Sequence, residues 1–193
     1  MMTMMTKRIV MAVALAAVTG PALAQQGQPR GKAETTINGK KVVIDYGRPA
    51  LKGRTLDVLM KDLPEDRIWR AGENQVTTLD TQTVLNIGGK PVPAGKYSLY
   101  VHAPAQGDWA LVVNKNLGIP LVDIWAEAPA EMKKELWPRL DGYSNVTKDE
   151  VARVPMKKST GAAADVFAIA IKGDQLTLSW GDTIWATTIK AGT

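Results

Sequence analysis

The chain has 193 residues with no cysteine and one histidine. This composition excludes disulfides and argues against a tight transition-metal site, so we expect no metal and no cofactor. Its formal net charge of +5 falls to +3 without Lys7 and Arg8, the only charged residues among the first 24, and the remaining charges are interleaved as on a solvated surface, which argues against a nucleic-acid partner.

The first 24 residues contain the three regions of an export signal in order. Two basic residues precede an apolar run over residues 9–18, and Ala-Leu-Ala at residues 22–24 is a small-residue cleavage site. The apolar run is too short for a transmembrane helix, which needs roughly 20 residues. We therefore expect a signal peptide over residues 1–24 that is cleaved after Ala24, with no membrane span remaining.

The rest of the chain is predicted to form one exported domain, either periplasmic or secreted. Residues 25–33 are rich in Gln, Gly and Pro, and this composition indicates a flexible lead-in. Residues 34–193 are long enough to bury a sizeable core within a single domain.

Short strands and tight turns begin at once. Residues 34–37 and 40–46 form a predicted hairpin, because Asn38-Gly39 between them supplies the two positive φ angles of a type I′ turn. Residues 55–60 form either a short helix, with Thr55 as its N-cap, or an edge strand. Further strands are expected over residues 75–80 and 83–87, which are rich in Thr and Val.

The clearest pattern covers residues 97–102 and 109–114, two runs joined by a polar turn. In the first run Tyr97, Leu99 and Val101 alternate with more polar residues. A period of two bounded by Pro and Gly predicts strands with one face on a core.

The pattern weakens over residues 117–148, which we interpret as an excursion from the sheet. Within it, residues 121–125 are a possible strand. Residues 128–136 predict a short helix, since Pro129 lies near its start, Glu comes early and Lys later.

Strands return in the last part of the chain. We expect them over residues 150–156, 165–172, 175–180 and 183–190, with Gly181-Asp182 as a two-residue type II′ turn. Many short strands with turn signals between them predict an all-β fold, an antiparallel, jelly-roll-like β-sandwich with one short helix in the excursion.

Four blocks, in order, resemble a secreted bacterial family, the domain of unknown function 2911. They are Y-G-R-P-A-L-K-G-R at residues 46–54, W-R-A-G-E-N at residues 69–74, I-G-G-K-P-V-P-A-G-K-Y at residues 87–97 and W-A-L-V-V-N-K at residues 109–115. The resemblance spans roughly residues 36–189. It implies an exported, mostly-β domain and implies no reaction. Glu73 stands where Ala is usual in the second block.

Arginines crowd the segment that holds the first two of these blocks: Arg48, Arg54, Arg67 and Arg70. Converging guanidinium groups bind a carboxylate, a phosphate or a sulfated sugar in two-pronged fashion. The alternative is internal ion pairing, because acidic residues lie in the same segment: Asp57, Asp62, Glu65, Asp66 and Glu73.

Six tryptophans against one phenylalanine are an unusual ratio. Flat indole faces stack on sugar rings, but they also fill cores and interfaces. Trp109 and Trp180 alternate with core residues, which favours burial, whereas Trp125 and Trp137 flank the expected helix and are better placed for exposure.

These observations favour a binding or accessory module of the cell envelope, for an anionic or carbohydrate ligand, over an enzyme. We assign its ligand surface to Arg48, Arg54, Trp69, Arg70 and Asn74, and we assign no catalytic residue. One alternative is a hydrolase of glycans or esters that uses Glu73 or Asp45 with His102, the only histidine. Another is a structural or assembly domain whose exposed strand edges pair with a partner.

Overall fold

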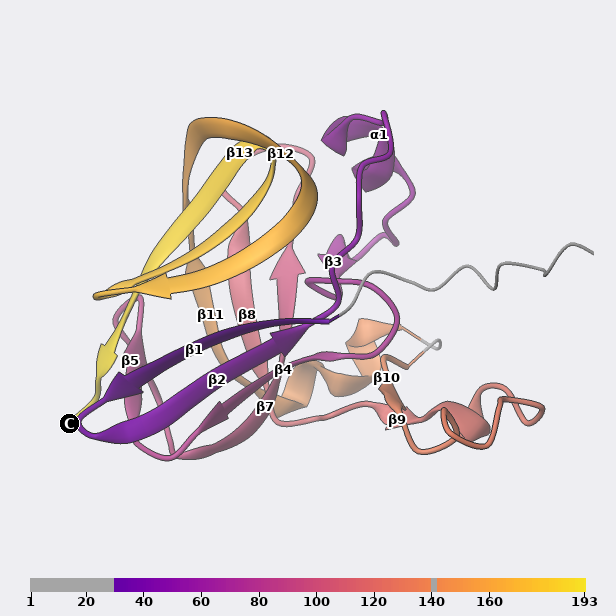
Figure 1. The fold of residues 1–193 in the computed structure, drawn as a ribbon, viewed down its shortest axis with the longest axis horizontal. Coiled ribbons are helices and arrows are strands. Elements are labelled where there is room, and N and C mark those ends of the chain that lie inside the picture. Colours follow the sequence, from indigo (N-terminus) through magenta and orange to yellow (C-terminus); the bar gives the residue numbers. More distant parts are fainter. Residues whose placement is uncertain (1–29, 140–141) are drawn as a thin grey trace, which may run out of the picture.

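The computed structural model describes residues 30–139 and 142–193. The expected signal peptide, residues 1–24, lies outside the described residues, and so do residues 25–29 of the lead-in. Two antiparallel sheets dominate the described part and pack in sandwich-like fashion (Figure 1). The prediction of an all-β antiparallel fold with sandwich-like sheets is confirmed.

The larger sheet has the strand order β1-β2-β4-β7-β8-β11, with β3 paired to β7. Its strands follow one another in chain order, as in a meander. Their bounds are β1 (Gly31–Ile37), β2 (Lys40–Tyr46), β3 (Ile68–Trp69), β4 (Thr77–Thr81), β7 (Gly95–His102), β8 (Ala110–Asn114) and β11 (Glu150–Pro155).

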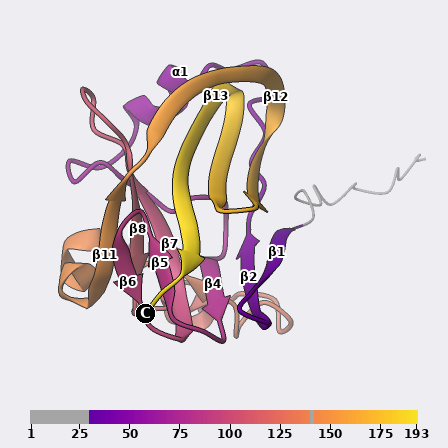
Figure 2. The same ribbon diagram turned by 90° about the vertical axis from the view of Figure 1, so that its left-hand side faces the viewer.

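The smaller sheet has the order β12-β13-β5-β6. Its strands are β5 (Leu85–Ile87), β6 (Lys90–Val92), β12 (Lys157–Lys172) and β13 (Gln175–Ala191). The chain passes from β11 into β12 through Met156 alone, and β12 with β13 then forms a long ribbon that arches over the end of the larger sheet (Figure 2).

Side chains from both sheets form the main core between the layers. Ile44, Leu79 and Leu111 come from the larger sheet, and Phe167 and Leu178 from the smaller. Each is almost fully buried, and burying an aliphatic or aromatic side chain of this size stabilises the fold by roughly 1.5–3 kcal/mol.

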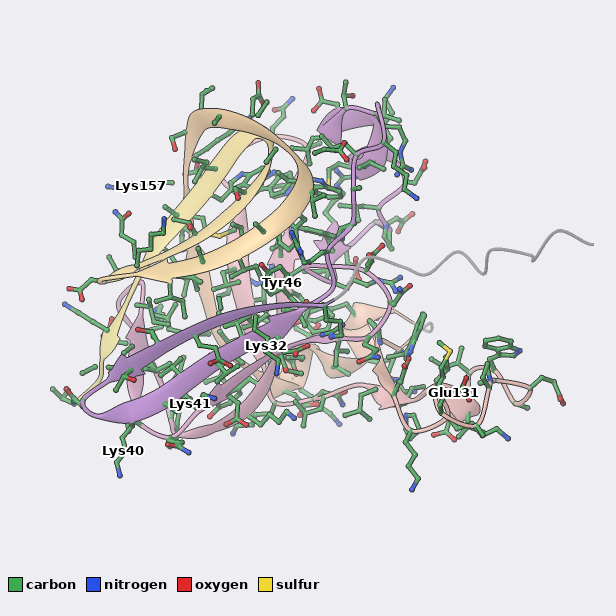
Figure 3. All side chains as sticks on the ribbon, viewed as in Figure 1. Lys32, Lys40, Lys41, Tyr46, Glu131 and Lys157 are labelled. Carbon is green, nitrogen blue, oxygen red and sulfur yellow. The ribbon has the colours of Figure 1, made fainter. Side chains whose placement is uncertain are left out.

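A hydrogen bond also joins the two layers. The Tyr46 hydroxyl donates to the Ile169 carbonyl at 3.3 Å. Figure 3 shows Tyr46 between the β1–β2 hairpin and the ribbon, whereas Lys40 and Lys41 extend outward from the hairpin.

The first hairpin forms as its sequence predicts. Asn38 and Gly39 have φ angles of 50° and 69°, the positive values that a type I′ turn requires. β1 begins at Gly31, inside the expected lead-in, and pairs Gly31 with Tyr46. The ordered sheet therefore starts three residues before residue 34.

The ambiguous segment after the hairpin is a helix. α1 (Leu56–Lys61) has Thr55 as its N-cap, whose hydroxyl accepts from the Val58 amide at 3.3 Å. The first turn carries Asp57 and the last carries Lys61, an arrangement that complements the helix dipole. No helix within the described ranges is long and apolar enough to cross a membrane.

The predicted turn at Gly181-Asp182 is wrong. β13 continues through both residues and stays paired with β12 on either side, from Ser179 to Thr183. Gly181 has a φ of +61°, and the register shifts there because β12 uses extra residues opposite it. The extra residues of β12 therefore make the pairing irregular on both sides of Gly181, and β13 runs through the glycine without a turn that ends the strand.

The predicted helix over residues 128–136 is also wrong. Isolated turns occupy this stretch, such as the bond from the Lys133 amide to the Pro129 carbonyl at 3.2 Å. The excursion consists of η1 (Leu121–Asp123), η2 (Tyr143–Asp149) and a two-stranded ladder of β9 (Ile119–Pro120) with β10 (Leu136–Trp137). The arm between β9 and β10 extends away from the sheets (Figure 1).

Candidate functional site

The central hairpin of the larger sheet is covered on both faces, contrary to the prediction of one core face. On the outer face, Tyr100 of β7 and Val112 of β8 pack with Tyr143 and Val146 of η2 and with Ile68 of β3. The rings of Tyr100 and Tyr143 meet edge to face, with centroids 4.8 Å apart. The end of the excursion therefore builds a second, smaller core on this face.

A cavity of about 360 Å³ opens beside this second core. Its volume lies within the range of about 300–1,000 Å³ that is usual for small-molecule sites. Aromatic and apolar side chains dominate its wall, with a few charged groups among them. The lining residues are Asp62, Leu63, Pro64, Asp66, Ile68, Trp69, Arg70, Tyr100, Pro138, Arg139, Gly142, Tyr143 and Val146.

Asn114, at the end of β8, anchors the η2 side of this cavity. Its fully buried amide donates to the Tyr143 hydroxyl at 3.0 Å and to the Val146 carbonyl at 2.8 Å. Its carbonyl oxygen accepts from the Asn116 amide at 2.7 Å. All of these bonds are buried or partly buried, so Asn114 holds the cavity wall against the sheet.

Burial shifts the pKa values of three groups in the cavity wall. Burial raises the pKa values of Tyr100 and Tyr143, because the phenolate form would lose its hydration. Burial likewise lowers the pKa of Arg70, with Tyr100 opposing this shift. Both tyrosines stay neutral and Arg70 stays charged at physiological pH.

The cavity wall holds two cations, Arg70 and Arg139, and two carboxylates, Asp62 and Asp66. Arg70 is partly buried. Its Nη1 donates to the backbone carbonyl of Asn74 at 3.4 Å. It has no other hydrogen bond and no ion pair with residues 30–139 or 142–193. Because a guanidinium has five N–H donors, most of its hydrogen-bonding capacity is unused by the protein.

Only part of the predicted ligand surface lies at this cavity. Trp69 and Arg70 line the cavity, and Asn74 contributes its carbonyl to Arg70 while its own side chain is exposed. Trp69 is mainly a core residue, stacked on Trp180 with ring centroids 5.3 Å apart. It therefore contributes to the cavity wall as a core side chain instead of offering an open stacking face.

The remaining two arginines are not brought into this cavity. Arg54 folds back on its own loop, with Nε donating to the Leu51 carbonyl at 2.9 Å and Nη2 to the Ala50 carbonyl. The Nε of Arg48 is buried without a hydrogen-bond partner among the described residues. Neither lines the cavity around Arg70.

Asp45 and His102, two residues of the hydrolase hypothesis, lie apart in the sheet. Asp45 pairs with Thr78, and Thr78 with Ser98, so His102 lies four residues farther along β7. Strand geometry puts this separation at about 13 Å along the strands and about 10 Å across them. Asp45 bonds Arg30 instead, and the charged groups that act on His102 are Arg153, Asp66, Glu150 and Arg67, without Glu73.

Sequence reasoning missed Tyr100 and Tyr143. Tyr100 lies on the face of β7 that the alternation assigns to solvent. Tyr143 follows Gly142 in a polar stretch with no periodic pattern, so no signal in the sequence identifies it. Within the described ranges, no three His, Cys, Asp or Glu side chains gather as metal ligands would.

The fold and the cavity define a class: an antiparallel, sandwich-like β-protein with a small aromatic cavity on the outer face of its larger sheet. The chain belongs to the family described as "Protein of unknown function (DUF2911)", whose model matches residues 28–189. Searches of curated proteins and of solved structures found no match.

Proposed function

We propose that the protein is a binding module and that the cavity beside Arg70 takes a small anionic ligand with a ring or another apolar body. The observation that carries this proposal is a partly buried guanidinium with no carboxylate partner among the described residues. Burying an unpaired charge is unfavourable, and an incoming anion offsets that cost.

The geometry of the wall supports this ligand class. A carboxylate, phosphate or sulfate can accept two parallel bonds from the free N–H groups of Arg70. The rings of Tyr100 and Tyr143, with the edge of Trp69, provide apolar surface for the rest of the ligand. A neutral ligand would leave the partly buried charge of Arg70 unpaired, so the acid group of the ligand provides the selectivity.

The first test measures the stability of the ligand-free protein. If Arg70 is kept for binding, Arg70→Met should leave thermal stability unchanged or raise it by about 1 kcal/mol, because an unpaired, partly buried charge is removed. Arg54→Met is the matched control, since Arg54 is exposed and bonds only its own loop. A loss of more than about 1 kcal/mol in Arg70→Met alone would make Arg70 a structural residue.

The second test measures binding with defined probes. Benzoate and glucuronate each combine a ring with a carboxylate, and benzyl alcohol and glucose are their uncharged counterparts. At a concentration a hundred times Kd, an acid should stabilise the wild type by about 2.7 kcal/mol. The proposal predicts this gain for wild type and Arg54→Met and its loss in Arg70→Met. Equal gains from the uncharged counterparts, or no gain in wild type beyond that of Arg70→Met, would contradict it.

We also propose that the protein works outside the cytoplasm. Support comes from the order of basic, apolar and small-residue regions in residues 1–24. Mass spectrometry of the protein from its native cell fraction tests this, with an N-terminus at Gln25 as the expected result. A mature chain that retains residues 1–24 would contradict it.

A further inference from the structure

A second, larger cleft of about 840 Å³ lies between three segments that are far apart in the chain. α1 with its N-cap forms one wall, the loop between β7 and β8 another, and part of the β12–β13 ribbon the third. Gly181 on the ribbon packs against α1, since a Cβ there would meet Leu56 Cδ1 at 3.7 Å. Figure 1 shows α1 beside the upper bend of the ribbon. The cleft shares no lining residue with the cavity around Arg70.

Two stacked tryptophans form a flat platform in this cleft. The rings of Trp109 and Trp185 lie 4.3 Å apart with an interplanar angle of 7°. Trp185 is buried beneath, whereas Trp109 is only half-buried and contributes its remaining surface to the cleft. Stacking on Trp185 already restricts the Trp109 side chain. A ligand that stacks on Trp109 therefore causes little further loss of side-chain entropy.

Charged side chains of both signs surround the platform in equal numbers: Asp57, Asp108 and Asp182 against Lys61, Arg67 and Lys158. Asp57, Lys61, Asp108 and Lys158 form no hydrogen bond or ion pair through their side chains with the rest of the described chain. The cleft therefore presents free donors and free acceptors with no net charge.

The bulged part of β12 opposite Gly181 contributes to this arrangement. It lies across the ladder from the point where Asp182 and Thr183 of β13 enter the cleft wall, and Lys158 lies directly across the ladder from Trp185. Bulges commonly redirect side chains toward sites. The glycine-aspartate pair that resembles a turn in the sequence thus shapes this wall.

We propose that this cleft binds a neutral saccharide chain, with one sugar ring stacked on Trp109 and the hydroxyl groups bonded by the surrounding carboxylates and ammonium groups. Hydroxyl groups both donate and accept, so they suit a wall with both kinds of partner. A polyanion or a polycation would meet three like charges. The volume is more than twice that of the cavity around Arg70 and leaves room for more than one ring.

Fluorine NMR of protein labelled with 5-fluorotryptophan tests the proposal directly. Six tryptophans give six signals, each assigned by its Trp→Phe variant. Maltohexaose, cellohexaose and chitohexaose are the probes. At least one of them should shift the Trp109 signal saturably and leave Trp125, on the arm, and Trp69, in the first cavity, unmoved.

A charge-matched pair of double variants then tests the polar partners. Asp108→Ala with Lys158→Ala removes one acid and one base from the cleft and should weaken binding by about tenfold or more. Glu131→Ala with Lys133→Ala makes the same change on the exposed arm, where Figure 3 shows Glu131 far from the ribbon, and should leave the affinity unchanged. All four residues are exposed, so folding is not at risk.

Three results would overturn the proposal. The first is that none of the three saccharides shifts the Trp109 signal. The second is that the two double variants bind saccharide with equal affinity. The third is that spermine or a heparin hexasaccharide shifts the Trp109 signal at lower concentration than any neutral chain. The same label reports on Trp69 in the cavity around Arg70. A negative result for saccharide binding at Trp109 can therefore be told apart from a negative result for anion binding at Arg70.

Discussion

Asn114 is the side chain on which the wall of the first cavity depends, and Asn114→Ala tests this. The substitution removes the bonds to the Tyr143 hydroxyl, the Val146 carbonyl and the Asn116 amide. At roughly 1 kcal/mol for each bond, the loss comes to about 3 kcal/mol. The groups left unpaired are buried or partly buried, so water does not readily replace the amide.

The assay is thermal and urea unfolding of wild type and variant at one pH. For a domain of this size, about 3 kcal/mol lowers Tm by roughly 6–12 °C. Asn86→Ala is the control, because Asn86 makes a single side-chain bond, to the Gly89 amide at 2.9 Å, in an exposed turn. It should cost at most about 1 kcal/mol.

Hydrogen exchange is a second measurement, which distinguishes loosening of the cavity wall in η2 from loosening of the sheet. Loss of Asn114 should speed hydrogen exchange in η2 more than in β7, since η2 is held by this side chain and β7 by its ladder. Equal stability of Asn114→Ala and Asn86→Ala, or unchanged exchange in η2, would refute the view that Asn114 secures the cavity.

Three further predictions concern pH and close packing. Burial raises the pKa values of Tyr100 and Tyr143, so the folded protein keeps protons that the unfolded chain releases, and stability should fall as pH rises above about 10; Tyr143→Phe should reduce this fall in alkaline urea titrations. Burial lowers the pKa of His102, so the unfolded chain binds its proton first and stability should decline as pH drops below about 6.5, less steeply in His102→Gln. A methyl group at Gly47 would overlap the backbone nitrogen and oxygen of Glu73, so Gly47→Ala should cost about 1–3 kcal/mol in urea unfolding.

The parts of the fold that the sequence predicts are those set by neighbouring residues. Asn38-Gly39 determines its own turn through two positive φ angles, and Thr55 caps α1 through a hydroxyl three residues from its donor. Strand alternation places Leu99 and Val101 in the main core without reference to any distant residue.

The incorrect predictions arose where distant contacts override local signals. Gly181-Asp182 has turn chemistry, but pairing with β12 on both sides keeps β13 extended, and the extra residues lie in β12 opposite the glycine. Residues 128–136 carry helix-end signals on a segment too short to be stable as an isolated helix, and the body of the fold supplies no face for it to bury against.

The candidate site was predictable only in part, for the same reason. Arg70 and Trp69 stand out by residue type, but nothing local indicates that Tyr143, far along the chain, packs on Tyr100. Arg48 and Arg54 are arginines like Arg70, but neither lines its cavity. Arg54 bonds its own loop, and the Nε of Arg48 is buried elsewhere, so residue type alone does not identify the site.

The excursion between β8 and β11 explains why the cavity exists. These two strands are neighbours in the larger sheet, so a short turn would join them, yet residues 115–149 intervene. Connections longer than about 12–15 residues usually serve a function, and the added closure entropy grows only slowly with length. The segment returns as η2, buries Tyr143 and Val146 on the outer face, and leaves a gap beside Arg70. The proposed binding role accounts for this gap and for the unpaired, partly buried Arg70 in its wall.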